Sequence, residues 1–237
     1  MPKTQPIVHI VALTGAAGSG KDSAACALAS AGWRTVAYAD AIRSEACKNW
    51  HIDERYFTTR HCKDEPFPTL SIDHSKNPDF IRWAMQTLRG SDESPSECIS
   101  APRSPRWVMQ RWGDYKRRFN TYYWSDIVSR WIDYQIAYDN TNVVITDLRM
   151  PWEQTHLKAK LQTLERVGVN AKLTTIRIHR PGLQKTDDPH PTEQLIHSLK
   201  TDLTINNDST LVALSEQILS AVGNQSNTNS YVHGVMA

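Results

Sequence analysis

The chain has few cysteines, little net charge and no long apolar run, and each shortage excludes a class of protein. Its four cysteines form no C-x-x-C pair and no zinc-finger spacing, so we interpret them as incidental free thiols. A net charge of +2 is too small to imply a nucleic-acid or membrane partner through bulk electrostatics. No apolar segment approaches membrane-spanning length, and residues 1–6 are too polar for a signal peptide. We therefore expect a cytoplasmic protein.

The remaining composition is that of an ordinary globular protein. Hydrophobic residues make up 40% of the 237 residues and charged residues 22%, which is enough apolar mass for a core. Segments of strand and helix pattern alternate along the chain, which predicts a three-layer α/β domain with a mainly parallel sheet. Residues 223–237, rich in Asn, Ser and Gln, are expected to be a disordered tail. The expected strands cover residues 7–13, 33–39, 142–146, 174–179 and 203–206.

A glycine loop follows the first expected strand and opens a helix. It reads Gly15-Ala16-Ala17-Gly18-Ser19-Gly20-Lys21-Asp22-Ser23. The spacing fits G-x-x-x-x-G-K, in which backbone N–H groups and a helix N-terminus hold phosphates. Asp22 departs from the motif, which has Ser or Thr after the lysine. The alternative is an ordinary glycine-rich turn, but three glycines and a lysine at these positions favour a nucleotide site that uses all nine residues.

Acidic and basic residues follow two other expected strands. Asp40 comes after the second strand, with Arg43 in the next turn, and Asp40 could either cap the following helix or bind a ligand. Asp147 comes after the third strand and is followed by Arg149. Open parallel sheets bind ligands at the carboxyl ends of their strands. An acid such as Asp147 typically organises the magnesium shell when a phosphate loop precedes it.

A basic stretch over residues 103–118 holds six cations against one acid. We expect a helix over 105–113, capped by Ser104 and ended by glycine. Arg106 and Gln110 share a face of that helix, and guanidinium groups match phosphate oxygens, so an anion clamp and a solvated basic face are both open. Interleaved aromatic residues also suggest nucleic-acid binding, although their spacing fits helix packing at least as well. These aromatic residues are Trp107, Trp112, Tyr115 and Tyr122.

Three segments lack a regular pattern and are expected to be loops. Residues 49–77 are interpreted as an excursion over the surface, and residues 91–101 as a loop of turn-forming residues. Residues 180–191 hold three prolines, a glycine, Arg180 and Lys185, a composition typical of a lid. The expected helices cover residues 22–31, 78–88, 105–113, 123–138, 152–167 and 209–222.

Several of these motifs occur together in one order. They are Gly18-Ser19-Gly20-Lys21-Asp22-Ser23, Ala39-Asp40-Ala41-Ile42-Arg43, Ser104-Pro105-Arg106, Met109-Gln110-Arg111-Trp112-Gly113, Tyr122-Tyr123-Trp124 and Val144 to Glu153. From about residue 7 to 222 the sequence resembles the deoxynucleoside monophosphate kinases of tailed bacteriophages, which are phosphate-loop (P-loop) kinases related to the adenylate and guanylate kinases. Loops of this family commonly read G-K-D-[ST]. Two positions depart from its pattern: Trp152 replaces a more usual Asn, and Thr192 a more usual Ser.

The resemblance implies a fold and a reaction. The fold is the three-layer P-loop kinase fold with a five-stranded, mainly parallel sheet, as one domain over 1–222. A substrate-binding segment over about 41–140 and a lid over about 180–191 are expected to move. The reaction transfers the γ-phosphoryl group of ATP to a deoxynucleoside 5′-monophosphate with Mg²⁺, giving dNDP and ADP for DNA synthesis. The location is the host cytoplasm if the chain is phage-encoded, and a homodimer is left open.

The resemblance also implies roles for individual residues. Asp22 and Asp147 would arrange the Mg²⁺ ion. The catalytic residues would be Lys21, Arg106, Arg149 and Arg180. The substrate-binding residues would be Asp40, Arg43, Arg103, Arg106, Gln110, Arg149, Trp152 and Glu153.

Two other functions fit the same motifs. A phosphate loop recognises ATP and not the acceptor, so a kinase for another small acceptor, such as dephospho-coenzyme A, is one alternative. A nucleotide-dependent nucleic-acid-binding protein that uses residues 103–118 is the other. We expect neither a membrane partner nor stable binding to nucleic acid.

Overall fold

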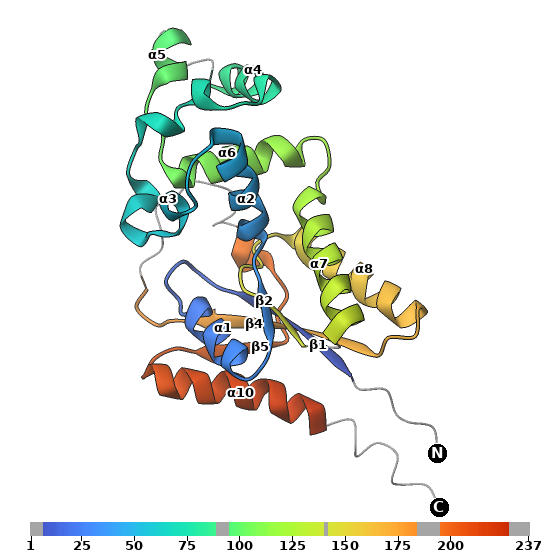
Figure 1. Cartoon of the computed structure of the whole chain (residues 1–237). Coiled ribbons are helices and arrows are strands. Elements are labelled where there is room, and N and C mark those ends of the chain that lie inside the picture. Colours follow the sequence, from blue (N-terminus) through green and yellow to red (C-terminus); the bar gives the residue numbers. More distant parts are fainter. Residues whose placement is uncertain (1–6, 89–94, 140–141, 184–194, 228–237) are drawn as a thin grey trace, which may run out of the picture. The chain divides into compact units, whose positions relative to one another are not determined.

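The computed structural model describes residues 7–88, 95–139, 142–183 and 195–227 (Figure 1). The chain divides into two compact units. The first unit takes the chain up to Ala37 and from Val128 onward, and the second unit is Tyr38–Ile127. The second unit thus overlaps the segment over about 41–140 that the sequence predicts to bind substrate.

The first unit is built on a five-stranded, all-parallel sheet. Its strand order is β2-β3-β1-β4-β5, so β1 is central and pairs with β3 and β4. Every residue of β1 is buried, which explains its continuous apolar sequence. The predicted α/β class with a parallel five-stranded sheet is therefore confirmed. The strands are β1 Val8–Thr14, β2 Arg34–Val36, β3 Val143–Ile145, β4 Ala171–His179 and β5 Leu203–Asn206.

Helices cover both faces of this sheet (Figure 1). Helices α1 (Lys21–Ser30) and α10 (Leu211–Asn227) pack together against one face, over a core that includes Leu13, Leu28 and Ile218. On the other face lies α8 (Pro151–Arg166), whose Gln154 donates to the hydroxyl of Thr175 in β4 at 3.3 Å. The part of α7 (Tyr123–Asp139) that belongs to the first unit pairs with α8 through Ser129 and His156, 3.2 Å apart. These contacts confirm the three layers.

The second unit is helical and has an aromatic core. Trp50, Phe80 and Trp112 lie with ring centroids 5.3–5.8 Å apart, and Tyr115 packs on Phe80 at 5.4 Å. The indole N–H of Trp50 donates to the carbonyl of Ser71 at 2.9 Å. The helices are α2 Tyr38–Trp50, α3 Arg55–Thr58, α4 Pro78–Thr87, α5 Pro95–Ser100 and α6 Pro105–Arg117, with 3₁₀ turns η1 Arg60–Asp64, η2 Pro68–Leu70 and η3 Ile72–His74.

The structure corrects two loop predictions. Residues 49–77 are not only a surface excursion, because Phe57, Leu70 and Ile72 are buried in the core of the second unit. The predicted loop over 91–101 contains helix α5 from Pro95. Both segments are rich in polar and turn-forming residues, and composition alone hid the apolar residues that anchor them.

Three helix ends also differ from the predictions. Helix α6 is capped by Ser104 as predicted, but it continues through Gly113 to Arg117. Gly113 is buried and its carbonyl accepts the indole N–H of Trp124, so tertiary packing overrides its low helix propensity. Helix α2 begins at Tyr38, which places Asp40 within the first turn and not at the cap. Helix α10 extends beyond residue 222 to Asn227, five residues into the predicted tail.

The four cysteines are free thiols, as predicted. Within the described ranges, no helix combines the length and the apolar character needed to cross a membrane.

Candidate active site

The predicted phosphate loop joins the end of β1 to the start of α1. Its three glycines, Gly15, Gly18 and Gly20, all have positive φ angles of 140°, 76° and 107°. A Cβ atom on Gly15 would lie 2.3 Å from the carbonyl oxygen of Ile178, and one on Gly20 would lie 2.4 Å from the side-chain amide of Asn207. The backbone conformation therefore favours glycine at both ends of this loop, and at Gly15 the backbone of β4 also leaves no space for a side chain.

Lys21 is the first residue of α1, and its side chain folds back into the loop. The residue is 8% exposed, and its ammonium group donates to the carbonyls of Gly15 and Ala16, at 2.8 Å each. Among the described residues, no side chain caps the N-terminus of α1. The first N–H groups of a helix attract anions when no side chain caps them, and a buried lysine adds a positive charge beside them. The arrangement can hold the phosphates of a nucleotide.

Two buried hydroxyl groups at the loop have no hydrogen-bond partner in the described part of the chain, those of Thr14 and Ser19. Thr14 is fully buried at the end of β1, and Ser19 is 1% exposed. A buried polar group without a partner is costly, so each hydroxyl is suited to a ligand that brings oxygen atoms. Sequence reasoning missed Thr14. Its only signal was a hydroxyl residue that ends a buried strand directly before the glycine loop.

The carboxyl end of β4 lies against the phosphate loop. Besides the contact of Ile178 with Gly15, the side chain of Leu183 lies 3.6 Å from the position of a Cβ on Gly18. Leu183 closes a turn by donating its N–H to the carbonyl of Arg180, an exposed residue, at 3.3 Å. The structure thus places the Arg180–Leu183 turn beside the loop. The rest of the predicted lid over 180–191, including Lys185, lies outside the described residues, as does Thr192.

Asp147 and Arg149 follow β3 and lie beside the end of β1. The N–H of Leu148, between them, donates to the carbonyl of Leu13 at 3.0 Å, two residues before the loop begins. The backbone N–H groups of Arg149 and Met150 both donate to one carboxylate oxygen of Glu153, at 3.0 Å each. Glu153 is 5% exposed, and this contact is the Glu half of a capping box at the start of α8. The contact fixes the backbone that carries Arg149, while Trp152 lies half-buried in the first turn of α8.

The described residues contain no group of three or more His, Cys, Asp or Glu side chains that could hold a metal ion. The two predicted ligands are Asp22, exposed in the first turn of α1, and Asp147, half-buried after β3. Magnesium in nucleotide enzymes is commonly held by one or two carboxylates together with phosphate oxygens and water. The chemistry of two carboxylates suits a Mg²⁺ ion that also takes phosphate oxygens and water as ligands.

Two of the predicted acceptor-binding arginines of the second unit, Arg43 and Arg106, are held by carboxylates. Arg106 forms a two-point contact with Asp64, at 2.5 and 3.2 Å, and this hydrogen bonding lowers the pKa of the Asp64 carboxyl. Arg43 contacts Asp40 at 2.8 Å and Glu54 at 3.2 Å. Sequence reasoning missed Asp64 and Glu54, because nothing local links them to an arginine 42 or 11 residues away.

The remaining charges of the basic stretch are also engaged. Arg103 lies over the ring of Trp107 at 4.8 Å and donates to the carbonyl of Cys98 at 2.9 Å. The uncharged Gln110 is half-buried, on the face of α6 that it shares with Arg106. Further along the helix, Lys116 pairs with Glu45 and Arg117 with Asp114. Trp112 and Tyr115 are buried in the aromatic core. Core packing therefore accounts for these two interleaved aromatic residues, which favours the helix-packing interpretation over nucleic-acid binding.

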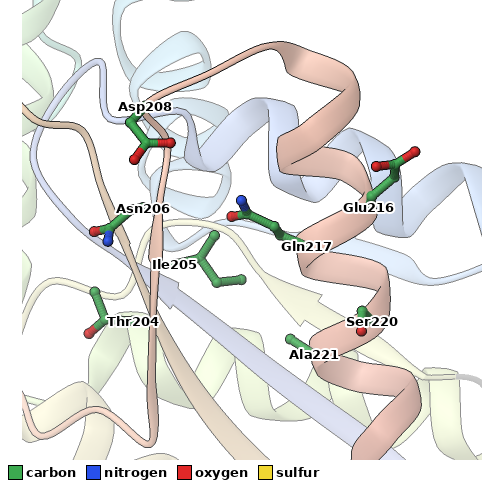
Figure 2. Close-up of a pocket in the computed structure, with 8 residues that line it drawn as sticks. All are labelled: Thr204, Ile205, Asn206, Asp208, Glu216, Gln217, Ser220 and Ala221. Atoms are coloured by element: carbon green, nitrogen blue, oxygen red, sulfur yellow. The ribbon is translucent and has the colours of Figure 1, made fainter.

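An open pocket of about 680 Å³ lies beside the sheet edge formed by β5. Figure 2 shows its lining, which comes from β5, from the residues after it and from α10. The pocket carries the carboxylates of Asp208 and Glu216, which repel phosphate, and none of its lining residues belongs to the predicted site. The lining residues are Thr204, Ile205, Asn206, Asp208, Glu216, Gln217, Ser220 and Ala221.

Comparison with known proteins adds a family to this geometry. A family model described as deoxynucleotide monophosphate kinase matches residues 97–218, just over half of the chain. The protein is therefore a nucleotide kinase. More particularly, the chain belongs to the deoxynucleotide monophosphate kinase family. The match includes Asp147, Arg149 and Glu153 but begins after the phosphate loop, so the interpretation of the loop depends on its own sequence and geometry.

Two solved structures share low similarity with the chain. A sugar kinase from Janibacter sp. HTCC2649, in an unliganded structure, is 14% identical with a TM-score of 0.42, and the alignment covers 92% of this chain and 95% of that one. The protein TT1252 from Thermus thermophilus is also 14% identical with a TM-score of 0.42, with coverage of 93% and 98%. At this similarity neither structure informs the function. No curated protein matches the sequence.

Proposed function

We propose that this kinase transfers the γ-phosphoryl group of ATP to the phosphate of a deoxynucleoside 5′-monophosphate, giving dNDP and ADP in the supply of nucleotides for DNA synthesis. Membership of the deoxynucleotide monophosphate kinase family supports a deoxynucleoside monophosphate as the acceptor. The observation that carries the ATP half is the loop from Gly15 to Ser23, where positive-φ glycines and the buried Lys21 surround an uncapped helix N-terminus.

Lys21 and the loop would hold the donor phosphates. The ammonium group now donates to two carbonyls, of Gly15 and Ala16, and would exchange these for β- and γ-phosphate oxygens. The hydroxyls of Thr14 and Ser19 are available as further polar partners, and Ser23 would serve the α-phosphate. The two hydroxyls already lie at the loop, so Lys21 is the group that would change its partners when the nucleotide arrives.

Asp22 and Asp147 would hold a Mg²⁺ ion that is bound to the phosphates. When bound, the ion offsets the negative charge that builds up on the transferring group. Asp22 contributes from the first turn of α1, and Asp147 from the segment that Leu148 ties to β1. A carboxylate suits a hard cation as well as the hydroxyl that other loops place after the lysine.

The acceptor needs positioning more than it needs a base. A phosphate monoester loses its second proton near pH 6, so its attacking oxygen is already anionic at neutral pH. Arg43, Arg106 and Arg149 would grip this phosphate, with Arg106 exchanging the carboxylate of Asp64 for phosphate oxygens of similar geometry.

Further residues would complete the acceptor and transfer sites. Arg180 would close over the transferring group with the lid, and water would be excluded during transfer. Glu153 would act by fixing the backbone of Arg149. We assign acceptor binding to the Tyr38–Ile127 unit, with contributions from Asp40, Arg103 and Gln110, and from Trp152 at the start of α8.

The test is an acceptor panel. The four dNMPs, their ribonucleotide counterparts and dephospho-coenzyme A are each supplied with ATP and Mg²⁺, and ADP release is followed. We expect ADP that depends on at least one dNMP and is absent with Lys21→Ala. If ADP is released only with dephospho-coenzyme A, the acceptor is that compound and not a dNMP. If no acceptor gives ADP, and the protein shows ATP-dependent binding to DNA that weakens steeply with salt, the function is nucleic-acid binding and not phosphoryl transfer.

A further inference from the structure

Asn207 lies where the end of the sheet meets the phosphate loop. It directly follows β5, and its backbone N–H donates to the carbonyl of His179 at 2.7 Å, which continues the pairing of β4 with β5. Its side-chain amide donates to the carbonyl of Ser19 at 2.9 Å, across 188 residues of sequence. A residue anchored by the sheet through its backbone thus contacts the loop through its side chain.

The absence of a side chain at Gly20 makes room for this contact. A Cβ at Gly20 would lie 2.4 Å from the amide nitrogen of Asn207, 3.3 Å from its Cγ and 3.3 Å from the side chain of Leu214 in α10. The missing side chain lets the amide of Asn207 approach the Ser19–Gly20 peptide closely. Leu214 is a buried residue of the core, so the core also lies close to the Cβ position of Gly20.

The hydrogen bond fixes the direction of one peptide plane. The described residues contain no cis peptide bond, and in a trans peptide the C=O and the N–H point in opposite directions. Holding the carbonyl of Ser19 toward Asn207 therefore points the N–H of Gly20 in the opposite direction, away from Asn207. The N–H groups at this point of a phosphate loop, just before and within the first turn of the helix, are those that hold phosphate.

We propose that Asn207 is a positioning residue for the donor nucleotide, which holds the Ser19–Gly20 peptide with its N–H toward the ATP phosphates. This inference rests on the proposed function, in which the loop binds ATP. Asn207 does not contact the reacting atoms. A neutral amide suits the role, because a cationic donor would compete for the phosphate and a carboxylate would repel both the Ser19 carbonyl and the nucleotide.

The test compares Asn207→Ala and Asn207→Asp with the wild-type chain, by calorimetric binding of ATP and of ADP and by steady-state kinetics. Asn207→Ala should raise the KM and Kd for ATP about three- to tenfold, the factor that one neutral hydrogen bond contributes. Asn207→Asp should raise them more than about tenfold, because it also adds a negative charge. The KM for the dNMP should stay within about twofold, since the acceptor is not held by this peptide.

A pH profile separates positioning from a general loss of structure. When the carboxyl group introduced by Asn207→Asp is protonated, it regains a hydrogen-bond donor and loses its charge. The ratio of ATP affinity between wild type and Asn207→Asp should therefore narrow as the pH falls from 8 to 5. Asn206→Asp is the matched control: it makes the same change one residue earlier, at an exposed side chain whose partner is His179, and should leave ATP affinity within about twofold.

The outcomes separate this inference from the proposed function. If wild type binds no ATP, the proposed function fails. If wild type binds ATP and both Asn207 variants bind it equally well, the positioning role alone is wrong. The role is also wrong if Asn206→Asp weakens ATP binding as much as Asn207→Asp does. It is wrong as well if Asn207→Ala and Asn207→Asp both lose their fold by circular dichroism, since Asn207 would then serve the fold as a whole.

Discussion

Replacing Gly15 by alanine tests whether the phosphate loop is built around a glycine at its first position. Gly15 has a φ of 140°, and a Cβ there would lie 2.3 Å from the carbonyl oxygen of Ile178, 2.9 Å from the hydroxyl of Ser19 and 3.3 Å from the carbonyl carbon of Ile178. The first and third of these neighbours are backbone atoms of β4, paired with β1 on one side and β5 on the other. They cannot rotate away as a side chain could.

The magnitude follows from two separable costs. A residue other than glycine in such a backbone conformation costs about 1–3 kcal/mol. Inserting a methyl group where no space exists typically costs about 1–3 kcal/mol more. Gly32 provides the matched control, because its φ of 89° is also positive but, apart from its own chain neighbours, no described atom lies within 4 Å of its Cβ position. Gly32→Ala should therefore show the backbone cost alone.

The assay is urea unfolding of the full chain by circular dichroism, together with calorimetric ATP binding. Gly15→Ala should be destabilised by at least about 1 kcal/mol more than Gly32→Ala, and it should lose ATP binding while Gly32→Ala retains it. Equal unfolding midpoints and equal ATP affinity in the two variants would refute the close approach of β4 to the loop.

The other predictions concern charges of the proposed site. Lys21→Ala should reduce dNMP-dependent ADP production to background with the circular-dichroism spectrum unchanged, because the ammonium group donates to carbonyls of the loop itself; wild-type turnover would contradict the assignment. Arg106→Ala should raise the KM for the dNMP more than that for ATP, and equal effects on both would remove Arg106 from acceptor binding. The same change should raise the pKa of Asp64, measured by NMR titration, because Arg106 is the main cause of its lowering. The lowered pKa means that this pair stabilises the fold above the ordinary pKa of Asp and loses its effect as pH falls through the lowered value; the contribution is small because both side chains are largely exposed. Asp22→Ser should change the Mg²⁺ concentration that gives half-maximal rate, and an unchanged titration would show that Asp22 does not take part in metal binding.

The fold class was predictable because the first unit has strong local patterns. The run from Val8 to Thr14 is apolar on both faces, as a central parallel strand must be, and the glycine loop after it has one common structural meaning. Helix α7 and strand β5 were also found with nearly correct bounds. The second unit was harder to predict, since its core depends on residues scattered through short turns, such as Leu70 and Ile72.

Where prediction was wrong, packing outweighed local preference. Gly113 marks a helix end in most sequences, yet α6 passes through it because Trp124 bonds to its carbonyl and the position is buried. Aspartate is a residue type favoured at helix N-caps, but α2 begins at Tyr38, two residues before Asp40. Asp40 instead pairs with Arg43 in the next turn of the helix. Such choices depend on neighbours that sequence spacing does not reveal.

By itself, the sequence determined the parts of this protein that lie next to one another along the chain: the buried strand, the glycine loop and the lysine that starts the helix. These depend on backbone preferences and burial, which a short pattern records. Only the tertiary structure decided that Arg106 meets Asp64 and that Asn207 holds the carbonyl of Ser19. Those partners are far apart in sequence, and they meet because the packing of the second unit and of the parallel sheet brings them together.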